Sequence, residues 1–182
     1  YIPTNGQSGG VTRSAETCNG AGTSDTFNDS EGVLMAEISA LANDGANKQM
    51  SLNNTTGNNT LRIIYNANNI RAFVQVSSST VVDITYALSN AKDALRVLLK
   101  YKVNDYALWV NGFEVGTDTN APIFSANTLN QFSFDDSSSS NFYGKTKQIQ
   151  YFDTALTDEE LEELTSWDSF RDMAIAQQYT II

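Results

Sequence analysis

The chain has 182 residues, about the length of one domain, with a formal net charge of −10 and no histidine. The lack of histidine excludes His-based catalytic triads and His metal sites, and the one cysteine cannot form an internal disulfide, so a binding or assembly module is favoured over an enzyme. The acidic charge disfavours nucleic acid as a partner, and no apolar run approaches the ~20 residues that span a bilayer, so we expect no membrane insertion.

The first 32 residues are rich in glycine, serine, threonine and asparagine, which favour turns over regular elements. We predict an extended entry segment over residues 1–16, with isolated strand pairing around residues 11–15. Because the chain begins with Tyr1 rather than methionine, we expect earlier sequence to precede it. Residues 33–41 show no clean period, and we interpret them as a strand.

Three alternating segments follow and predict neighbouring strands. In LRIIY, residues 61–65, the side chains alternate between two faces. An asparagine-rich turn leads into RAFVQV, residues 71–76, and the two segments form a predicted hairpin. After a run of serines, VVDITY at residues 81–86 predicts a third strand.

Residues 87–103 fit two patterns. Leucine and alanine fall at helical spacing along the segment, whereas from Arg96 onward apolar residues alternate with basic ones as in a strand. The neighbouring strands favour the second interpretation.

The strongest local signal is YALWVNGFEVG, residues 106–116. Asn111 and Gly112 stand between two alternating runs, and this pair is typical of a type I′ hairpin turn, in which both central residues need positive φ. Two more strands are predicted at residues 130–134 and 145–152. Short strands at this spacing indicate an all-β sandwich.

The character of the sequence changes at Thr157, and residues 157–176 predict two terminal helices. Thr157 and Glu160 have the spacing of a capping box, and the acidic first turn suits the positive end of a helix. A second short helix is predicted over residues 169–176, with Ser169 as its cap. The acidic run DEELEE is interpreted as a solvated helix face, with a calcium site or an acidic docking patch as the alternatives.

Two segments match a known pattern. Residues 100–115, KYKVNDYALWVNGFEV, match a strand ending Y-x-x-N-D that leads into an L-Y-V-N-G hairpin, with Trp109 where tyrosine is common. Residues 142–164, FYGKTKQIQYFDTALTDEELEEL, match a last strand and a closing helix. Both resemble the laminin-G-like, concanavalin-A-like jelly-roll family. Thr146 departs from the pattern, since an apolar residue is usual there, so we expect this strand to begin with a bulge or to lie at an edge.

The two ends of the chain resemble a narrower group of proteins. YIPTNGQSGGVTRSAE at residues 1–16 and SWDSFRDMAIAQQYTI at residues 166–181 resemble segments that flank such jelly rolls in tail and fibre proteins of tailed bacteriophages. The resemblance covers nearly the whole chain and implies a single domain over residues 1–182. The implied fold is all-β, an antiparallel jelly-roll β-sandwich with a short C-terminal helical segment.

The resemblance also implies a role. The chain is expected to be a non-catalytic, lectin-like carbohydrate-binding module of a virion tail or surface appendage, which recognises a surface glycan. One alternative is a structural virion decoration or assembly domain that contacts sister subunits, with a homo-oligomer as one form of it. Another is an accessory domain of a secreted, extracellular bacterial adhesin or enzyme. Because this fold carries many unrelated functions, the resemblance is more specific for fold than for activity.

Catalysis on such a fold has recognisable requirements. Enzymes of this fold that cut β-glucans carry Glu-x-Asp-x-x-Glu or a close variant on one strand, because two carboxylates must flank one glycosidic bond. The chain has no such triplet. Jelly-roll lyases combine histidine with tyrosine, arginine and glutamine, and that set is incomplete here, so we assign no catalytic residue.

Sugar binding without a metal needs an exposed aromatic ring beside polar side chains. Trp109 is the candidate, because its strand neighbours Leu108 and Val110 point to the opposite face. If their strands lie in the same sheet, three polar side chains become its partners: Arg62, Arg71 and Gln75. The alternative is that Trp109 packs beneath a loop or the terminal helix. Trp167 is interpreted as a packing anchor.

No cofactor is required by these expectations, and calcium-assisted binding is the alternative. Calcium takes several oxygen ligands, often from loops. Two acidic loops could supply them, and their candidate metal ligands are Asp25 and Asp29, with Asn28 and Glu31 nearby, and Asp135 and Asp136. Neither loop has EF-hand spacing, and aspartate and asparagine in loops commonly form turns.

Overall fold

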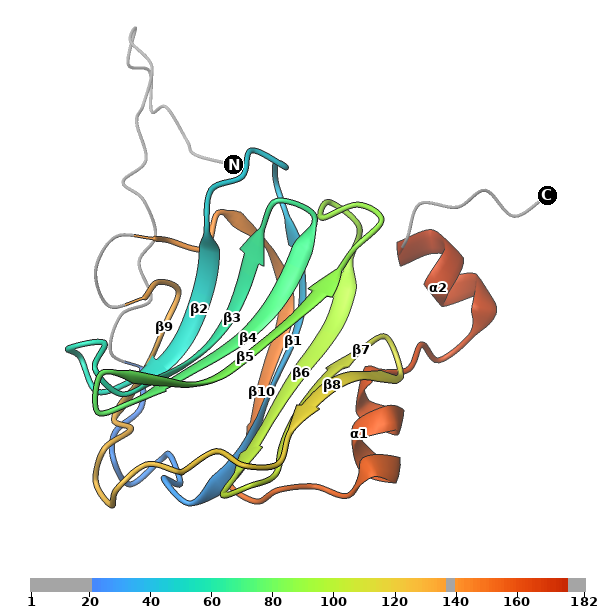
Figure 1. Ribbon diagram of the computed structural model, residues 1–182. Coiled ribbons are helices and arrows are strands. Elements are labelled where there is room, and N and C mark those ends of the chain that lie inside the picture. Colours follow the sequence, from blue (N-terminus) through green and yellow to red (C-terminus); the bar gives the residue numbers. More distant parts are fainter. Residues whose placement is uncertain (1–20, 137–139, 177–182) are drawn as a thin grey trace, which may run out of the picture.

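The computed structural model describes residues 21–136 and 140–176 (Figure 1). Within these residues the chain forms two five-stranded antiparallel sheets, packed face to face, and two short helices near the C-terminus. The first sheet runs in the order β10 (Gly144–Phe152), β1 (Glu31–Ala40), β6 (Leu95–Lys102), β7 (Tyr106–Val110) and β8 (Phe113–Asp118). The second sheet runs in the order β5 (Ser79–Ala87), β4 (Asn69–Val76), β3 (Thr60–Asn66), β2 (Lys48–Asn53) and β9 (Gln131–Ser133).

The first and last strands of the described chain are neighbours. β1 pairs with β10 on one side and with β6 on the other, so Met35 lies opposite both Gln150 and Leu98. The second sheet is built mainly from consecutive hairpins, and β9 joins it beside β2. The predicted antiparallel jelly-roll β-sandwich with a short C-terminal helical segment is therefore confirmed.

The individual strand predictions are also met. Asn111 and Gly112 have φ values of 50° and 85°, as the turn between β7 and β8 requires. The ambiguous segment becomes a strand from Leu95 onward, so its helical interpretation is wrong. The predicted entry segment, residues 1–16, and the pairing around residues 11–15 lie outside the described residues.

Thr146 lies where the strand becomes irregular. β10 is an edge strand, and its register against β1 shifts between Glu37 and Ile38. Ile38 is opposite Thr146 and Glu37 is opposite Gln148, so Lys147 is the extra residue of a bulge. Both features expected from the polar residue at position 146 are present.

The main core fills the space between the two sheets. Alternate residues of the central strands point inward and are fully buried, as Leu34 on β1 and Ile63 on β3 illustrate. Burial of this apolar surface is the main favourable term for the fold. Three tyrosines also lie deep in it: Tyr65, Tyr101 and Tyr106.

A smaller apolar cluster lies on the outer face of the first sheet. Helix α1 (Asp158–Thr165) places Leu161 on a group of side chains that point away from the main core: Val33, Met35, Leu98, Ala107 and Trp109. Val33 and Met35 of β1 are buried in this cluster, while Leu34 and Ala36 are buried in the main core, so both faces of β1 are buried here. This explains why residues 33–41 show no alternation in the sequence.

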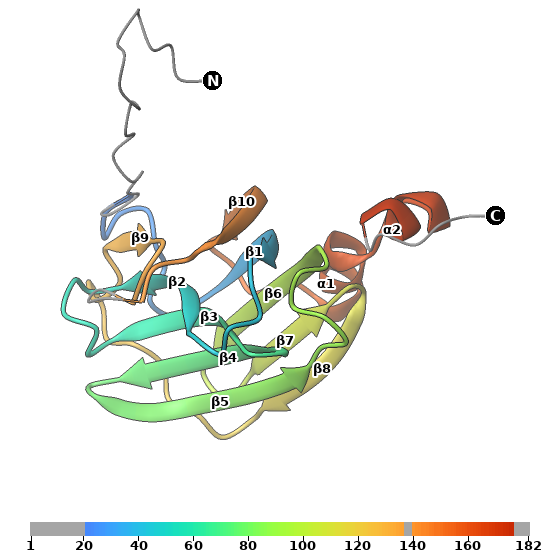
Figure 2. The same cartoon turned by 90° about the horizontal axis from the view of Figure 1, so that it is seen from above.

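The two helices begin as the sequence predicts. Thr157 caps α1, since its backbone N–H donates to Glu160 Oε2 at 2.8 Å and its hydroxyl accepts from the Glu160 backbone at 3.4 Å. Helix α2 (Phe170–Ala176) follows, and the Asp172 backbone N–H donates to the Ser169 hydroxyl at 3.1 Å. Figure 2 shows α2 beyond α1, at the end of the molecule opposite β9. Neither helix has the length and apolar character needed to cross a membrane.

Candidate functional site

Trp109 lies on β7 in the first sheet and faces outward, but it is only 6% exposed. Leu161 of α1 and Met35 of β1 belong to the cluster that covers it. A sugar can stack only on an aromatic face that solvent reaches. The exposed ring expected at Trp109 is therefore absent, and the alternative, packing beneath the terminal helix, is the observed arrangement.

The three proposed partners of Trp109 lie in the other sheet. Arg62 is on β3, and Arg71 and Gln75 are on β4, so the condition that they share a sheet with Trp109 is not met. They do share the outer face of the second sheet with one another. Phe73 lies among them, because it pairs directly with Arg62 across the two strands.

This arginine cluster is already paired with carboxylates. The central carbons of the Arg62 and Arg71 guanidinium groups lie 5.5 and 4.9 Å from the Phe73 ring centroid. Arg71 donates two hydrogen bonds to Asp83, at 2.5 and 2.6 Å, and these bonds raise the Arg71 pKa. Burial lowers the pKa of Arg62, which lies 3.8 Å from Asp136. The charges are thus largely balanced within the protein.

The four candidate calcium ligands lie in loops. Asp29 accepts backbone hydrogen bonds from Thr128 and Leu129, the shortest at 2.7 Å, and so ties two loops together. Asp25 is exposed, the Asp135 carbonyl accepts a bond from Ser51, and Asp136 faces Arg62. In the part of the chain that the structure describes, no group of three or more His, Cys, Asp or Glu side chains could hold a metal ion.

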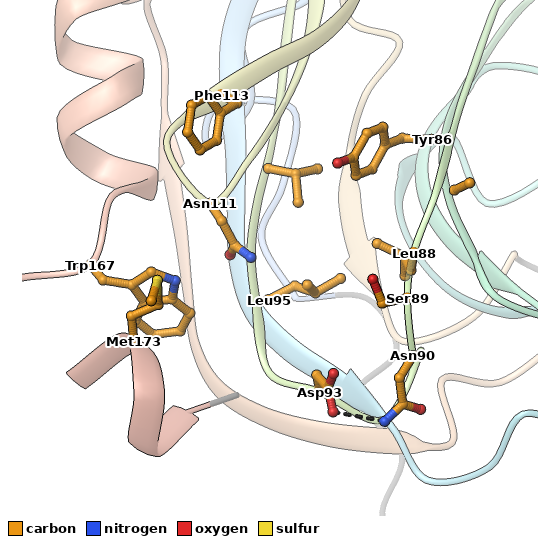
Figure 3. Close-up of a pocket in the computed structure, with 12 residues that line it drawn as sticks. Tyr86, Leu88, Ser89, Asn90, Asp93, Leu95, Asn111, Phe113, Trp167 and Met173 are labelled. Carbon is orange, nitrogen blue, oxygen red and sulfur yellow. Dashed lines mark hydrogen bonds between the residues drawn. The ribbon is translucent and has the colours of Figure 1, made fainter. Parts of the chain in front are cut away.

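A cavity of about 280 Å³ opens at one end of the sandwich (Figure 3). We call it the end cavity. Tyr86 and Ser89 lie on one side of it in this view, Trp167 and Met173 lie on the other, and Leu95 lies between them. It is therefore built from both sheets and from the segment that contains α2.

The β7–β8 turn fixes the positions of two walls of the end cavity, because it bonds to β6 and contacts the end of α1. Asn111 bonds β6 twice, since its backbone N–H donates to the Arg96 carbonyl and its side-chain oxygen accepts from the Arg96 N–H, both at 2.9 Å. The Gly112 N–H donates to the Thr165 hydroxyl at 3.1 Å. A Cβ atom on Gly112 would lie 2.6 Å from the Ser166 hydroxyl oxygen, so the turn sits directly against the end of α1. This contact brings Trp167 to the cavity.

The rim combines exposed aromatic rings with amides. Phe113 is 73% exposed and Tyr86 is 40% exposed. Asn90 donates to Asp93 at 2.7 Å, and Asn111 lies on the opposite side of the cavity. Of the described residues that line the cavity, Asp93 alone carries a charge at neutral pH. Apolar rings with a few fixed polar groups are the usual composition of small-ligand sites.

Local sequence patterns did not predict this cavity. Tyr86 lies one residue before the end of β5, Phe113 follows a turn, and Trp167 was expected only as a packing anchor. Trp167 does pack, because the Arg96 guanidinium lies 4.7 Å from its ring centroid, and it also forms a wall of the cavity. The available signal was the large apolar Phe113 directly after a turn, opposite Val110 at the end of the sheet.

No family model and no curated protein matches the chain. Solved structures do resemble it. The Ruminococcus gnavus IT-sialidase CBM40 bound to alpha2,3 sialyllactose has a TM-score of 0.66 at 14% identity, over 84% of this chain and 97% of that one. Domain 4 of a Geobacillus stearothermophilus extracellular arabinanase, in complex with arabinotriose, has a TM-score of 0.63 at 13% identity, over 80% and 70% of the two chains. The Limulus polyphemus SAP-like pentraxin has a TM-score of 0.64 at 13% identity, over 84% and 76%. At these identities the likeness establishes the jelly-roll fold.

Proposed function

We propose that this domain is a non-catalytic glycan-binding module and that a sugar occupies the end cavity. The observation that carries the proposal is the pair of exposed rings, Tyr86 and Phe113, at the rim of a hollow that also presents Asn90 and Asn111. An aromatic ring can cover the apolar face of a sugar, while amides bond its hydroxyl groups. This matches the general design of a sugar site better than the buried Trp109 does.

Two further considerations support the proposal. Structures with this fold include a module bound to sialyllactose and a domain in complex with arabinotriose. In addition, the paired carboxylates of glycan hydrolysis were not found in the sequence, and Asp93 is the one carboxylate among the described residues around the cavity. We therefore propose binding without chemistry.

The setting of the module is a proposal that rests on the resemblance alone. The end segments, residues 1–16 and 166–181, resemble those of bacteriophage tail and fibre proteins, so we propose a virion appendage as its location. Weak binding at each site would then be strengthened by display of many copies. The alternatives are an assembly domain that contacts sister subunits and a module of a secreted protein.

A glycan array tests the proposal. The purified domain is applied to bacterial and algal polysaccharides, with and without calcium, beside Phe113→Ala and Tyr86→Ala. Tyr143→Ala is the matched control, because Tyr143 is 63% exposed but does not line the end cavity. We expect each cavity variant to lose about tenfold in affinity, equivalent to about 1.4 kcal/mol, and the control to keep it.

Two other results of the array would contradict a sugar site in the end cavity. A hit that requires calcium would move the site to the acidic loops around Asp29 and Asp136. A blank array with working positive controls would overturn glycan binding and favour the assembly role, for which light scattering would measure the oligomeric state.

A further inference from the structure

A second cavity of about 380 Å³ adjoins the end cavity. We call it the far cavity. Trp167 lines both, and α2 contributes Met173 to the end cavity and Asp172 and Ile175 to the far cavity. The floor of the far cavity is the outer face of the first sheet, with Glu37 on β1, Arg96 on β6 and Lys147 on β10. Trp167 thus stands at the boundary between two hollows.

Two hydrogen-bond donors at this boundary lack an acceptor. Arg96 Nε and Trp167 Nε1 are both buried, and no described residue accepts a hydrogen bond from either. The nearest carboxylate oxygen to Arg96 Nε belongs to Glu37, at 3.6 Å, which is beyond hydrogen-bonding distance. A buried donor without an acceptor is unfavourable, so an oxygen acceptor that reached either donor would be bound favourably.

The charges of the far cavity are mixed, with an acidic excess. Glu37 is buried and already accepts from Lys147 at 2.8 Å and from Gln148 at 3.2 Å. Arg96 is likewise occupied, since it donates to the Ser166 carbonyl and stacks on Trp167. Asp168, which lies 3.8 Å from Arg96, and Asp172 are exposed acids, so three acidic and two basic side chains line this cavity. With Asp93 in the end cavity, the two hollows repel an anionic ligand rather than attract it.

We propose that the two cavities form one groove that binds a neutral oligosaccharide with sugar units on both sides of Trp167. This inference rests on the proposed glycan-binding function and adds the ligand class. The volumes agree with it, because ligand sites span roughly 300–1,000 Å³ and the end cavity alone is slightly smaller than that range. Because both unpaired donors are buried, an alcohol or ring oxygen of the sugar accepts from them only after Trp167 or Arg96 shifts toward the groove. A carboxylated sugar would add a negative charge beside Asp168 and Asp172.

The experiment measures affinity against chain length by calorimetry. The probes are the disaccharides to hexasaccharides of neutral glucose, mannose and N-acetylglucosamine series, with oligogalacturonides and alpha2,3 sialyllactose as the acidic probes. We expect at least one neutral series to gain tenfold or more between its disaccharide and its longer members. We expect the acidic probes to bind at least tenfold more weakly than the longest members of that neutral series.

Two variants test whether the increase in affinity with oligosaccharide length arises in the far cavity. Ala94→Phe fills the far cavity, which Ala94 lines, without altering a residue of the end cavity. Ala126→Phe is the matched control, on an exposed loop outside both cavities. We expect Ala94→Phe to remove the length-dependent gain and to leave disaccharide binding unchanged, and Ala126→Phe to leave both intact. Thermal unfolding of each variant shows whether it is folded.

The failures of the two proposals can be told apart. If a disaccharide binds and is lost in Phe113→Ala, but chain length has no effect, the extended groove is overturned and the glycan-binding function stands. The extended groove is also overturned if the gain survives in a folded Ala94→Phe variant or if the acidic probes bind best. If none of the probes and no glycan on the array binds, both proposals fail.

Discussion

The guanidinium group of Arg96 stacks on the indole of Trp167, with 4.7 Å between its central carbon and the ring centroid. The same guanidinium group donates a hydrogen bond to the carbonyl of Ser166. Arg96 belongs to β6, whereas Ser166 and Trp167 link α1 to α2. One side chain of the sheet therefore positions the aromatic wall of both cavities.

Replacing Arg96 with methionine tests this positioning. Methionine keeps an apolar stem but cannot stack as a cation or bond the Ser166 carbonyl, so Trp167 becomes more accessible to solvent. The cation–π contact contributes about 0.5–2 kcal/mol.

In a Trp109→Phe background Trp167 is the one remaining tryptophan, and we expect its fluorescence to be quenched more strongly by acrylamide in the Arg96→Met protein. Arg71→Met, on the other sheet, is the control. Unchanged quenching in a folded Arg96→Met protein would contradict the positioning role.

Trp109 is predicted to matter for stability and not for sugar contact. Trp109→Ala removes a buried ring beneath α1 and leaves a cavity, which costs about 3–5 kcal/mol. Denaturant unfolding measures this loss, and Trp109→Phe should retain part of the stability. Binding to the glycan array is expected to persist in the folded fraction. A stable Trp109→Ala protein that no longer binds glycan would contradict this prediction and indicate that Trp109 is part of the binding site.

These two tryptophans show how far the sequence could predict the molecule. Alternation correctly placed Trp109 on the face of β7 opposite Leu108. It could not show that Leu161, more than fifty residues later, would cover that face. The capping box predicted the helix but carried no information about where the helix would pack.

Strand β2 shows a different limit of prediction from the sequence, because it was missed altogether. Its residues include the polar Gln49, Ser51 and Asn53, and no strand was predicted there. All three are buried on the outer face of the second sheet, and Ser51 donates to the carbonyl of Asp135 at 2.7 Å. Met50 and Leu52 alternate with these polar residues and face the main core, but two apolar residues are too short a run to predict a strand from alternation alone.

The candidate site could not be predicted from the sequence, because its residues are far apart along the chain. Tyr86, Phe113 and Trp167 come from three separate parts of the chain and meet only because the ends of two sheets and the α2 segment converge. Arg62, Arg71 and Gln75 were expected beside Trp109, but the sequence did not show that their strands belong to the other sheet. Strand order is set by contacts distant in sequence, which local patterns do not report.

The arginine cluster on the second sheet is predicted to be dispensable for glycan binding. Arg71→Ala breaks a partly exposed pair with Asp83, and such pairs contribute about 1 kcal/mol or less. We therefore expect a small change in unfolding free energy and unchanged binding on the array. Asp83→Asn serves as the control for the ion pair. Loss of binding in both Arg62→Ala and Arg71→Ala, with Phe113→Ala unaffected, would place the site on this face instead.

The buried tyrosines predict a loss of stability at alkaline pH. Burial raises the pKa of Tyr65, Tyr101 and Tyr106 above the ordinary value of about 10. Their hydroxyl groups donate to backbone carbonyls, at 2.6 Å in the case of Tyr101 and Asn28. The folded state therefore keeps protons that the unfolded chain releases. The sign of the linkage is that stability is unaffected below about pH 10 and falls as pH rises further.

Each such tyrosine adds up to about 1.4 kcal/mol per pH unit to this fall. Urea unfolding at a series of alkaline pH values measures the slope, and the ultraviolet absorbance of tyrosinate should show these three side chains ionising only as the protein unfolds. Tyr101→Phe should lower stability at neutral pH and make the alkaline slope shallower by about one proton. Tyr143→Phe, at an exposed position, should change neither. Reversible ionisation of all eight tyrosines while the fold persists would contradict the burial of the three phenols.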